Sequence, residues 1–399
     1  MAAPPFLFQG GPCQRTLPSQ NLTKHAAQAH PATGLEGGAY RISVMAHTSF
    51  RIAVIAGDGI GPEVIPVGVD VLKAAAQKGG FTLEFTDLPW GCEFYLMTGK
   101  MMDDGWVATL KGFDAIYLGA IGAPSVPDYI SAGQLLLPLR QLLVQYVNLR
   151  PMRLMPGIKS PLGGRTAADI DMICVRENSE GEYCGVGGRV HVGTELEMAE
   201  QTGIFTRKGI ERVARFGFEL ARKRPRKLLA SATKSNALRH SMVLWDDVVD
   251  EVAKDYPDVE FRKYYVDALA ARMITHPQTV DVMITSNLFG DILTDIGSAI
   301  SGSLGVGPSG NINPERTFPS MFEPLHGSAP DIAGKGIANP IGTVWAGAMM
   351  LEFLGQTDAA ARILAAIESV LAEGSVRTAD LGGTATTREM GAALVAALA

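Results

Sequence analysis

The chain has 399 residues, of which 47% are apolar and 19% charged, and its formal net charge is −6. This length suits two domains, and the negative charge argues against a nucleic-acid footprint. No apolar run reaches the ~18 residues of a membrane span, so no membrane association is expected either. The four cysteines follow no zinc or disulfide spacing, which suits a reducing compartment, and we expect a cytoplasmic protein.

Residues 1–48 differ from the rest of the chain. They are rich in Pro, Gly, Gln and Ala and show no sustained periodicity. A transit peptide should be richer in Arg and Ser and more amphipathic. We therefore expect a disordered extension or a misread upstream start, with Met45 as a natural beginning.

From residue 51 onward, strand and helix patterns alternate. A buried strand at 51–56 leads into a glycine turn and a helix that starts at Pro62. Further strands are expected at 81–86, 114–118, 227–232, 259–265 and 280–285. Further helices are expected at 106–110, 210–221, 242–253, 268–274 and 358–372. This alternation predicts an α/β architecture with a largely parallel core.

The first glycine turn does not fit a Rossmann dinucleotide site. Gly57, Gly59 and Gly61 form G-x-G-x-G, whereas the fingerprint is G-x-G-x-x-G. A tight turn before a helix needs glycine even without a ligand. We therefore do not expect this turn to bind a dinucleotide.

Residues 283–295 run from an apolar strand through a polar turn into a helix that carries Asp291 and Asp295. Residues four apart share one helix face, so the two carboxylates can converge. Their repulsion is tolerated where a cation lies between them, and ligands made only of oxygen suit Mg²⁺ or Mn²⁺. A metal site and a solvated helix face both remain open for this pair alone.

Three arginines, Arg140, Arg150 and Arg176, stand near expected turns or strand ends. Pro151 disfavours helix at Arg150, so the chain can turn there and bring Arg140 and Arg150 together. Arg176 follows the apolar run 170–175, and α/β proteins bind ligands at the carboxyl ends of strands. Each could be an ordinary ion-pair arginine, but together their bidentate forks suit a dicarboxylate.

Three further residues have both a structural and a chemical interpretation. Tyr183 lies in a loop of glycines and acids, where a tyrosine beside a cation can donate a proton. Lys234 follows a strand and is either a surface residue or, if partly desolvated, a base. Asp267 lies between a strand and a helix, where it is either a helix cap or a third metal carboxylate.

The segment 322–340 is rich in glycine and alanine and has no periodic pattern. Long loops of this kind are often functional, and small residues let a flat ligand lie against the backbone. Asp331 could accept hydrogen bonds from a ribose diol and would repel a 2′-phosphate. This loop is therefore a candidate nucleotide site.

Several blocks together resemble one family. They are GDGIGPE at 57–63, NLRP at 148–151, RENSEGEY at 176–183, SNLFGDILTD at 286–295 and HGSAPDIAGKGIANP at 326–340. From about 51 to 355 the chain resembles the decarboxylating β-hydroxyacid dehydrogenases, which include isocitrate and 3-isopropylmalate dehydrogenases. QYVNLRPMRLMPG at 145–157 and NPIGTVWAGAMMLEFLG at 339–355 look most like the tartrate and D-malate branch.

The resemblance implies a role for each candidate. Substrate would be bound by Arg140, Arg150, Arg176 and Asp267. Mn²⁺ or Mg²⁺ would be held by Asp267, Asp291 and Asp295. NAD would lie on His326, Gly327, Ser328, Ala329, Asp331 and Asn339. Lys234 would assist deprotonation of the substrate hydroxyl, and Tyr183 would protonate the enol.

The resemblance also implies a two-domain fold of the isopropylmalate dehydrogenase type, with a mixed, largely parallel sheet rather than a true Rossmann fold. Residues 49–146 and 302–399 would form a large NAD-binding domain. Residues 147–301 would form a small domain that carries the dimer interface and the metal and substrate residues. In the implied homodimer, Lys234 and Asp267 would reach the partner's site.

Three positions before Arg140 depart from relatives of known substrate type. Isocitrate enzymes place Ser and Asn where this chain has Gln134 and Leu136, so isocitrate is not expected. Isopropylmalate enzymes place Glu at Gly133, and tartrate or malate enzymes place a bulky aromatic residue there. The expected reaction is oxidation of a 2-hydroxy dicarboxylate such as tartrate or D-malate, with decarboxylation, and the alternative is 3-isopropylmalate. A non-catalytic regulatory subunit is disfavoured because the reactive groups are intact.

Overall fold

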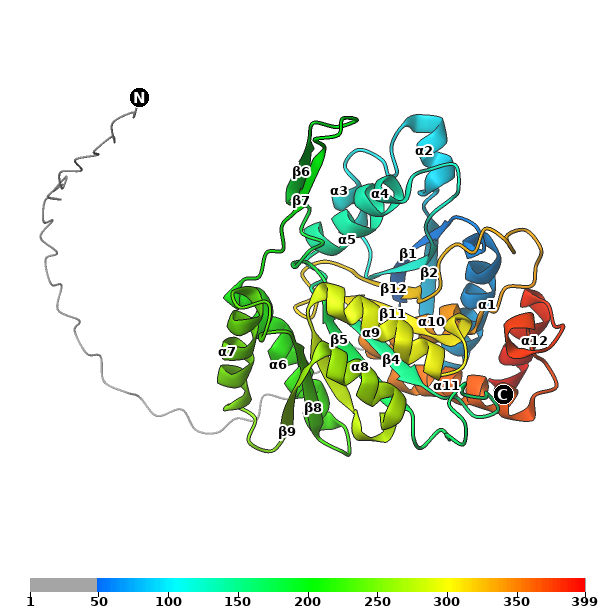
Figure 1. The fold of residues 1–399 in the computed structure, drawn as a ribbon. Helices are drawn as coiled ribbons and strands as arrows, with labels where there is room; N and C mark the ends of the chain where they lie inside the picture. The colour runs from blue at the N-terminus through cyan, green and yellow to red at the C-terminus, as the bar shows by residue number, and fades with distance from the viewer. Residues whose placement is uncertain (1–48, 399) are drawn as a thin grey trace, which may run out of the picture. The chain divides into compact units, whose positions relative to one another are not determined.

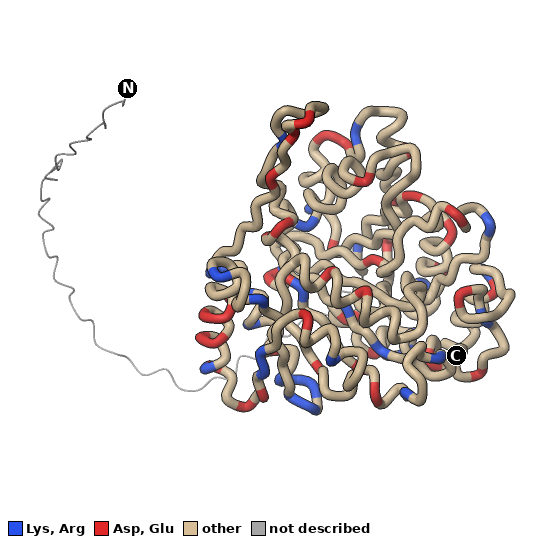
Figure 2. The backbone as a smooth tube through the Cα atoms, in the orientation of Figure 1, with Lys and Arg blue, Asp and Glu red and all other residues tan. Residues whose placement is uncertain are grey.

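The computed structural model describes residues 49–398, so the prediction for the N-terminal extension lies outside the described residues. The described chain forms a ten-stranded sheet covered by helices on both faces, with a separate two-stranded hairpin (Figure 1). No helix in this part of the chain combines the length and apolar composition needed to cross a bilayer. Figure 2 shows acidic and basic residues interspersed along the fold.

The large sheet has the strand order β2-β1-β3-β12-β11-β4-β5-β10-β8-β9. Its strands are β1 (Ser49–Gly57), β2 (Thr82–Asp87), β3 (Ala115–Ala120), β4 (Val147–Arg153), β5 (Asp171–Glu177), β8 (Leu228–Thr233), β9 (Glu260–Tyr265), β10 (Val282–Thr285), β11 (Pro308–Ile312) and β12 (Ser320–Pro324). Antiparallel pairing is confined to the centre, where β11 pairs with β12 and β4, and β4 pairs with β5. The other pairings are parallel, so the predicted mixed, largely parallel sheet is confirmed.

One face of the sheet carries a continuous apolar core. The helices over it are α1 (Gly61–Gly79), α6 (Arg207–Lys223), α7 (Ser241–Ala253), α10 (Ile341–Phe353), α11 (Thr357–Glu373) and α12 (Thr387–Ala397). The opposite face carries two separate cores. The first lies under α2 (Cys92–Thr98), α3 (Trp106–Leu110), α4 (Asp128–Ser131) and α5 (Leu137–Leu142), and the second under α8 (Val266–Thr275) and α9 (Asn287–Ile300). Polar side chains of the central strands lie between these two cores.

The glycine turn after β1 has a structural role. Gly59 has a φ of +57°, and a Cβ there would lie 2.0 Å from the Ser328 carbonyl oxygen. The Ile60 amide donates to that same oxygen at 2.9 Å. Buried Asp58 accepts hydrogen bonds from the amides of Cys92 and Gly122, both at 2.8 Å. The turn therefore joins β1 to the glycine-rich segment that follows β12.

The expected strands and helices are present within a few residues of their predicted ends. The hairpin strands β6 (Gly187–Val190) and β7 (Met198–Gln201) were not predicted, nor were β4, β11, β12, α10 and α12. The strands that lie within residues 147–301 make up one end of the large sheet, and those of the other segments make up the other end. The division into two domains stays a prediction.

Candidate active site

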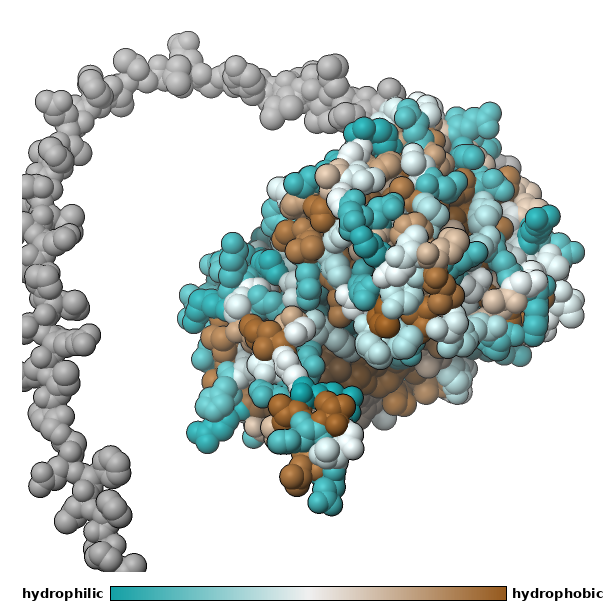
Figure 3. Space-filling model, turned by 90° about the horizontal axis from the view of Figure 1, so that it is seen from above, coloured by the Kyte–Doolittle hydropathy of each residue, from teal (hydrophilic) through white to brown (hydrophobic). Residues whose placement is uncertain are grey.

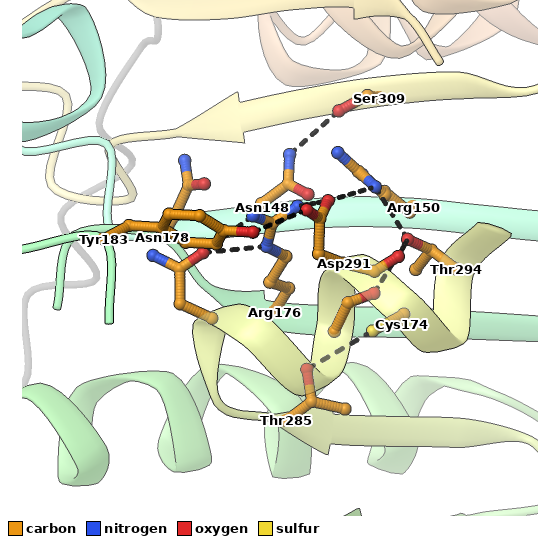
Figure 4. A network of polar contacts seen from close by, with 12 residues as sticks. Asn148, Arg150, Cys174, Arg176, Asn178, Tyr183, Thr285, Asp291, Thr294 and Ser309 are labelled. Atoms are coloured by element: carbon orange, nitrogen blue, oxygen red, sulfur yellow. Dashed lines mark hydrogen bonds and ion pairs between the residues drawn. The ribbon is translucent and has the colours of Figure 1, made fainter. Parts of the chain in front are cut away.

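The candidate site lies at the antiparallel centre of the sheet. Successive residues of a strand face opposite sides, so alternate positions share a face. On β4, Asn148 and Arg150 face the side that carries α9, and Arg176 does so from β5 (Figure 4). Asn311 and Glu323 extend this polar surface along β11 and β12. Strand pairing thus brings together residues that are far apart in the chain.

Asp291 on α9 is the centre of the site. Its Oδ1 accepts from Arg176 Nη1 at 2.5 Å and from Arg150 Nη1 at 3.5 Å. The Arg176 side chain is only 2% exposed, whereas that of Asp291 is 40% exposed. Burial opposes ionisation of Asp291, but Arg176 and Arg150 outweigh it and hold the pKa of Asp291 below its ordinary value. Asp291 is therefore an ionised carboxylate between two guanidinium groups.

Two neighbours on α9 complete this arrangement, and neither was predicted. Asn287 Oδ1 accepts from Arg176 Nε at 3.0 Å and Nη2 at 2.7 Å. Thr294 Oγ1 accepts from Arg150 Nη1 at 2.6 Å. Asn287, Asp291 and Thr294 are spaced i, i+4 and i+7, which places them on one helix face. That polar stripe in an otherwise apolar helix is the signal that could have revealed them.

Tyr183 joins the same cluster from the loop after β5. Its hydroxyl donates to Asp291 Oδ2 at 2.9 Å, and its ring lies 5.6 Å from the Arg176 guanidinium carbon. Burial, reinforced by the negative charge of Asp291, raises the pKa of Tyr183. The phenol therefore keeps its proton at neutral pH, as a proton donor must.

Arg140 reaches the cluster from α5. Its Nη2 donates to Glu323 Oε1 at 3.1 Å, and Asn311 Nδ2 donates to the same oxygen at 2.7 Å. Burial lowers the pKa of Arg176 to about 9, and the charges of Arg150 and Arg140 contribute. The three arginines therefore share one electrostatic environment, which is strongly attractive to a polycarboxylate. The sequence did not identify Glu323, because a glutamate inside an apolar run has no periodic signal.

Asp295 lies one helical turn beyond Asp291. Its side chain makes no hydrogen bond or ion pair with any described residue. Burial raises the pKa of Asp295, because together with the like charge of Asp291 it outweighs the opposing charges of Arg150 and Arg176. A carboxylate without a partner beside a second carboxylate fits a hard divalent cation. Both carboxylate oxygens of Asp291 already accept hydrogen bonds from Arg150, Arg176 or Tyr183. A cation at Asp295 would share the Asp291 oxygens with these donors.

Lys234 and Asp267 are paired with each other. Lys234 Nζ donates to Asp267 Oδ1 at 2.8 Å, which lowers the pKa of this carboxyl. Asp267 lies in the first turn of α8 without capping it, because Tyr265 is the cap residue and no side-chain cap bond forms. Within residues 49–398, no three acidic, histidine or cysteine side chains form a metal-binding group. The described chain therefore does not bring Asp267 to Asp291 and Asp295.

The segment from Leu325 to Pro340 contains no helix or strand. Gly327, Ser328 and Pro330 line a hollow of about 420 Å³ against residues 121–128. His326 Nδ1 lies 3.0 Å from the Gly327 carbonyl oxygen. His326 Nε2 is buried without a hydrogen-bond partner among the described residues, and burial lowers the pKa of this imidazole.

The other predicted cofactor residues differ in exposure. Asp331 is exposed and Ala329 half-buried, with a φ of +40° at Ala329. Asn339 is 6% exposed and supports the fold, since its amide donates to Asp380 at 2.9 Å and its oxygen accepts from the Ile341 amide at 3.0 Å. An orphaned imidazole nitrogen, an open hollow and an exposed carboxylate on one loop fit a nucleotide.

Comparison with known proteins identifies the class. Residues 51–394 match the model of the isocitrate/isopropylmalate dehydrogenase family, and the chain belongs to this family. An isocitrate dehydrogenase structure from Methylococcus capsulatus is 36% identical, with a TM-score of 0.79, over 88% of this chain and 99% of that one.

Among curated relatives, the chain is 54% identical to the decarboxylating D-malate dehydrogenase of Escherichia coli strain K12, over 87% of this chain and 98% of that protein. It is 52% identical to a tartrate dehydrogenase/decarboxylase of Pseudomonas putida, over 88% of this chain and 98% of that protein.

Proposed function

We propose that this protein oxidises a 2-hydroxy dicarboxylate of the D-malate or tartrate type with NAD and a divalent cation, and decarboxylates the oxo product. The observation that carries the proposal is the cluster of three buried arginines around Asp291 and Tyr183. Arg150 and Arg176 share Asp291 while Arg140 pairs with Glu323, so three guanidinium groups face two acids, and their bidentate forks suit the carboxylates of a substrate. The names of the relatives support the same reaction.

The residues divide the chemistry among them. Arg140, Arg150 and Arg176 bind and orient the substrate carboxylates. Lys234, supplied by a second copy of the chain, would take the proton of the C2 hydroxyl, and NAD, held by the 326–339 loop, would supply the hydride acceptor. Tyr183 then delivers its proton to C3 after CO₂ departs. A bound Mn²⁺ or Mg²⁺ supplies Lewis acidity, which stabilises negative charge on the 2-oxo group.

The shared site requires a homodimer. Within one chain, Lys234 and Asp267 form an ion pair with each other and do not contact the Asp291 cluster. In a homodimer, Lys234 and Asp267 of one chain would lie at the Asp291 cluster of the other chain. The β6–β7 hairpin exposes apolar side chains, with Leu196 69% and Met198 59% exposed, which supports pairing. The view from above, onto the side where this hairpin and α2 lie, shows brown side chains among teal ones (Figure 3). Asp291, Asp295 and the partner's Asp267 would then hold the cation.

The cofactor loop favours NAD over NADP. Asp331 is exposed on the loop. There its carboxylate would accept hydrogen bonds from the ribose hydroxyls, and its negative charge would repel a 2′-phosphate. The buried Nε2 of His326 would gain a hydrogen-bond partner from the bound nucleotide.

The free thiols of Cys92, Cys174 and Cys184 support a reducing, cytoplasmic location.

A substrate panel tests the proposal. The full chain with Mn²⁺ is offered D-malate, L- and meso-tartrate, isocitrate and 3-isopropylmalate, each with NAD and with NADP, and reduction of the nicotinamide is followed by absorbance. We expect turnover with D-malate or tartrate, at least about tenfold better with NAD, and release of CO₂. A folded dimer that binds Mn²⁺ and turns over none of these would instead support a regulatory subunit.

One observation favours 3-isopropylmalate or another C3-alkylated malate as the alternative substrate. Gly133 lies in the π-helical turn Ala132–Leu136, seven residues before Arg140. Gly133 is exposed, and a Cβ there would have no described atom within 4 Å, so there is open space at this position. A methyl or isopropyl group at C3 could occupy it.

The substitution Gly133→Tyr separates the two substrates. A tyrosine there would fill the open space, so kcat/KM for 3-isopropylmalate should fall at least about tenfold, within the range for a filled apolar pocket. Activity on D-malate should stay within about threefold. Gly163→Tyr is a control at another open glycine. An equal loss on both substrates would show that Gly133 does not set the selectivity.

A further inference from the structure

A large groove lies on the face of the sheet opposite the candidate site. It has a volume of about 790 Å³, within the range of about 300–1,000 Å³ typical of small-ligand pockets. Alternation along the strands explains its position. Leu149 and Ile173 face the groove, whereas Arg150 and Arg176 face the candidate site from the same strands.

The groove crosses the antiparallel centre of the sheet. Its floor combines Leu149 and Ile173 with Ile312 and Phe322 from β11 and β12. Its walls are α6 on one side and α10 and α11 on the other, which contribute Phe216 and Trp345 among other residues. Phe322 and Trp345 are buried, whereas Leu149, Ile173 and Phe216 are half-buried. Large apolar side chains are therefore recessed in a hollow where a hydrocarbon body would remove them from water.

The rim of this hollow is basic. It carries Arg153, Lys223, Arg224 and Arg316, against the carboxylates of Asp171 and Glu352. Arg153 is neutralised by Glu368 at 2.6 Å, and Arg224 pairs with Asp171 at 2.9 Å.

Two rim cations remain without a carboxylate partner within the described residues. Lys223 forms no ion pair there. Arg316 donates only to the Phe353 carbonyl oxygen, and its guanidinium lies 4.5 Å from the Phe353 ring centroid. Glu352 also lines this hollow and makes no ion pair with a described residue, so the unpaired groups at its mouth leave one net positive charge. An apolar hollow with this charge at its mouth is complementary to an anion that has a hydrocarbon tail.

We propose that this groove is a binding site for a free carboxylate with an apolar tail, such as a medium-chain fatty acid. The tail would lie on the floor formed by Leu149, Ile173 and Phe322. The carboxylate would lie at the basic rim, to which Lys223 and Arg316 contribute positive charge. The ligand would contact β4 and β5 directly behind Arg150 and Arg176, at a place separate from the substrate arginines.

Decanoate is the probe, titrated into the full chain by equilibrium dialysis and by the fluorescence of Trp345. We expect saturable binding of one molecule per chain. Octanoate, which is two methylenes shorter, should bind about fifteenfold more weakly, because each buried methylene contributes ~0.8 kcal/mol, or about fourfold. Decanol should bind more weakly than decanoate. In Trp345→Phe, dialysis should still detect binding while the fluorescence change is lost.

Charge variants place the ligand. Lys223→Glu should weaken decanoate binding about threefold, and Lys223→Glu with Arg316→Glu about tenfold, in line with exposed ion pairs. Lys208→Glu is the control, because Lys208 is exposed on the same helix but does not line the groove. Thermal unfolding shows whether each variant is folded. If the double variant does not fold, the comparison of Lys223→Glu with Lys208→Glu still tests the position of the ligand.

Several results would overturn the proposal. They are binding that does not saturate, equal binding of decanol and decanoate, and equal loss in Lys208→Glu and Lys223→Glu. A change in oligomeric state in Lys223→Glu, by sedimentation, would mean that a second copy covers this face. Because binding is measured without turnover, a failed substrate panel leaves this test intact.

Discussion

The Asp295→Asn variant is expected to lose catalysis while its metal-free fold keeps its stability. Asp295 makes no hydrogen bond or ion pair with a described residue, and the attraction of Arg150 opposes the repulsion of Asp291. An amide of the same shape removes both effects, so the free energy of unfolding should change by less than about 0.5 kcal/mol. The cation site loses a charged ligand, and kcat/KM should fall at least about 10³-fold, since a Lewis acid contributes several kcal/mol.

Thermal unfolding with and without Mn²⁺ measures the two effects separately. The wild-type chain should be stabilised by Mn²⁺ in proportion to ligand occupancy, and Asp295→Asn should not. Asp70→Asn, at an exposed aspartate on α1, controls for loss of one negative charge. Full Mn²⁺ stabilisation of Asp295→Asn would exclude Asp295 as a ligand, whatever the activity.

Much of the candidate site could be predicted because its chemistry lies in short blocks. The i, i+4 spacing of Asp291 and Asp295 follows from helix geometry alone. The strand end at Arg176 follows from the apolar run before it. These local patterns survive folding because they depend on neighbours in the sequence.

The centre of the sheet could not be predicted, for a physical reason. β4 contains Pro151, which cannot donate to a strand ladder and argues against a central strand, although the two faces of β4 meet the candidate site and the apolar groove. β11 reads Pro-Ser-Gly-Asn-Ile and is buried throughout, so it has neither alternation nor a continuous apolar run. Its stability comes from pairing with β4 and β12 across long sequence separations. A single sequence carries no signal for such pairing.

The role of Asp291 also differs from what spacing alone suggests. Its two oxygens contact Arg150, Arg176 and Tyr183, so it organises the buried arginines in addition to any metal role. Helix spacing reveals which residues share a face, but not which cations lie opposite them. The cations opposite Asp291 are Arg150 of β4 and Arg176 of β5, and the register of these two strands brings both to the face that carries α9.

Asp291→Asn should therefore behave differently from Asp295→Asn and destabilise the protein as well as abolish turnover. The neutral amide would leave Arg150 and Arg176 buried without a counter-charge. Breaking a fully buried ion pair costs about 3–5 kcal/mol. The Asp291 side chain is 40% exposed, so water screens part of this loss, and we expect about 1–2 kcal/mol.

Chemical denaturation at several pH values measures this loss. The folded pKa of Asp291 is below its unfolded value of about 3.9, so its stabilising effect is complete above that pH. The effect disappears as pH falls through the folded pKa, because both chains are then neutral at this position. The difference between wild type and Asp291→Asn should therefore be constant near neutral pH and shrink in acid.

Tyr183→Phe is the matched control, because it removes only the hydrogen bond to Asp291 Oδ2. It should cost about 1 kcal/mol or less, without the same dependence on pH. If Asp291→Asn were as stable as wild type at neutral pH, the arginines would not need this carboxylate. That result would contradict the structural role assigned to the Asp291 ion pairs and would leave Asp291 a role in binding or catalysis alone.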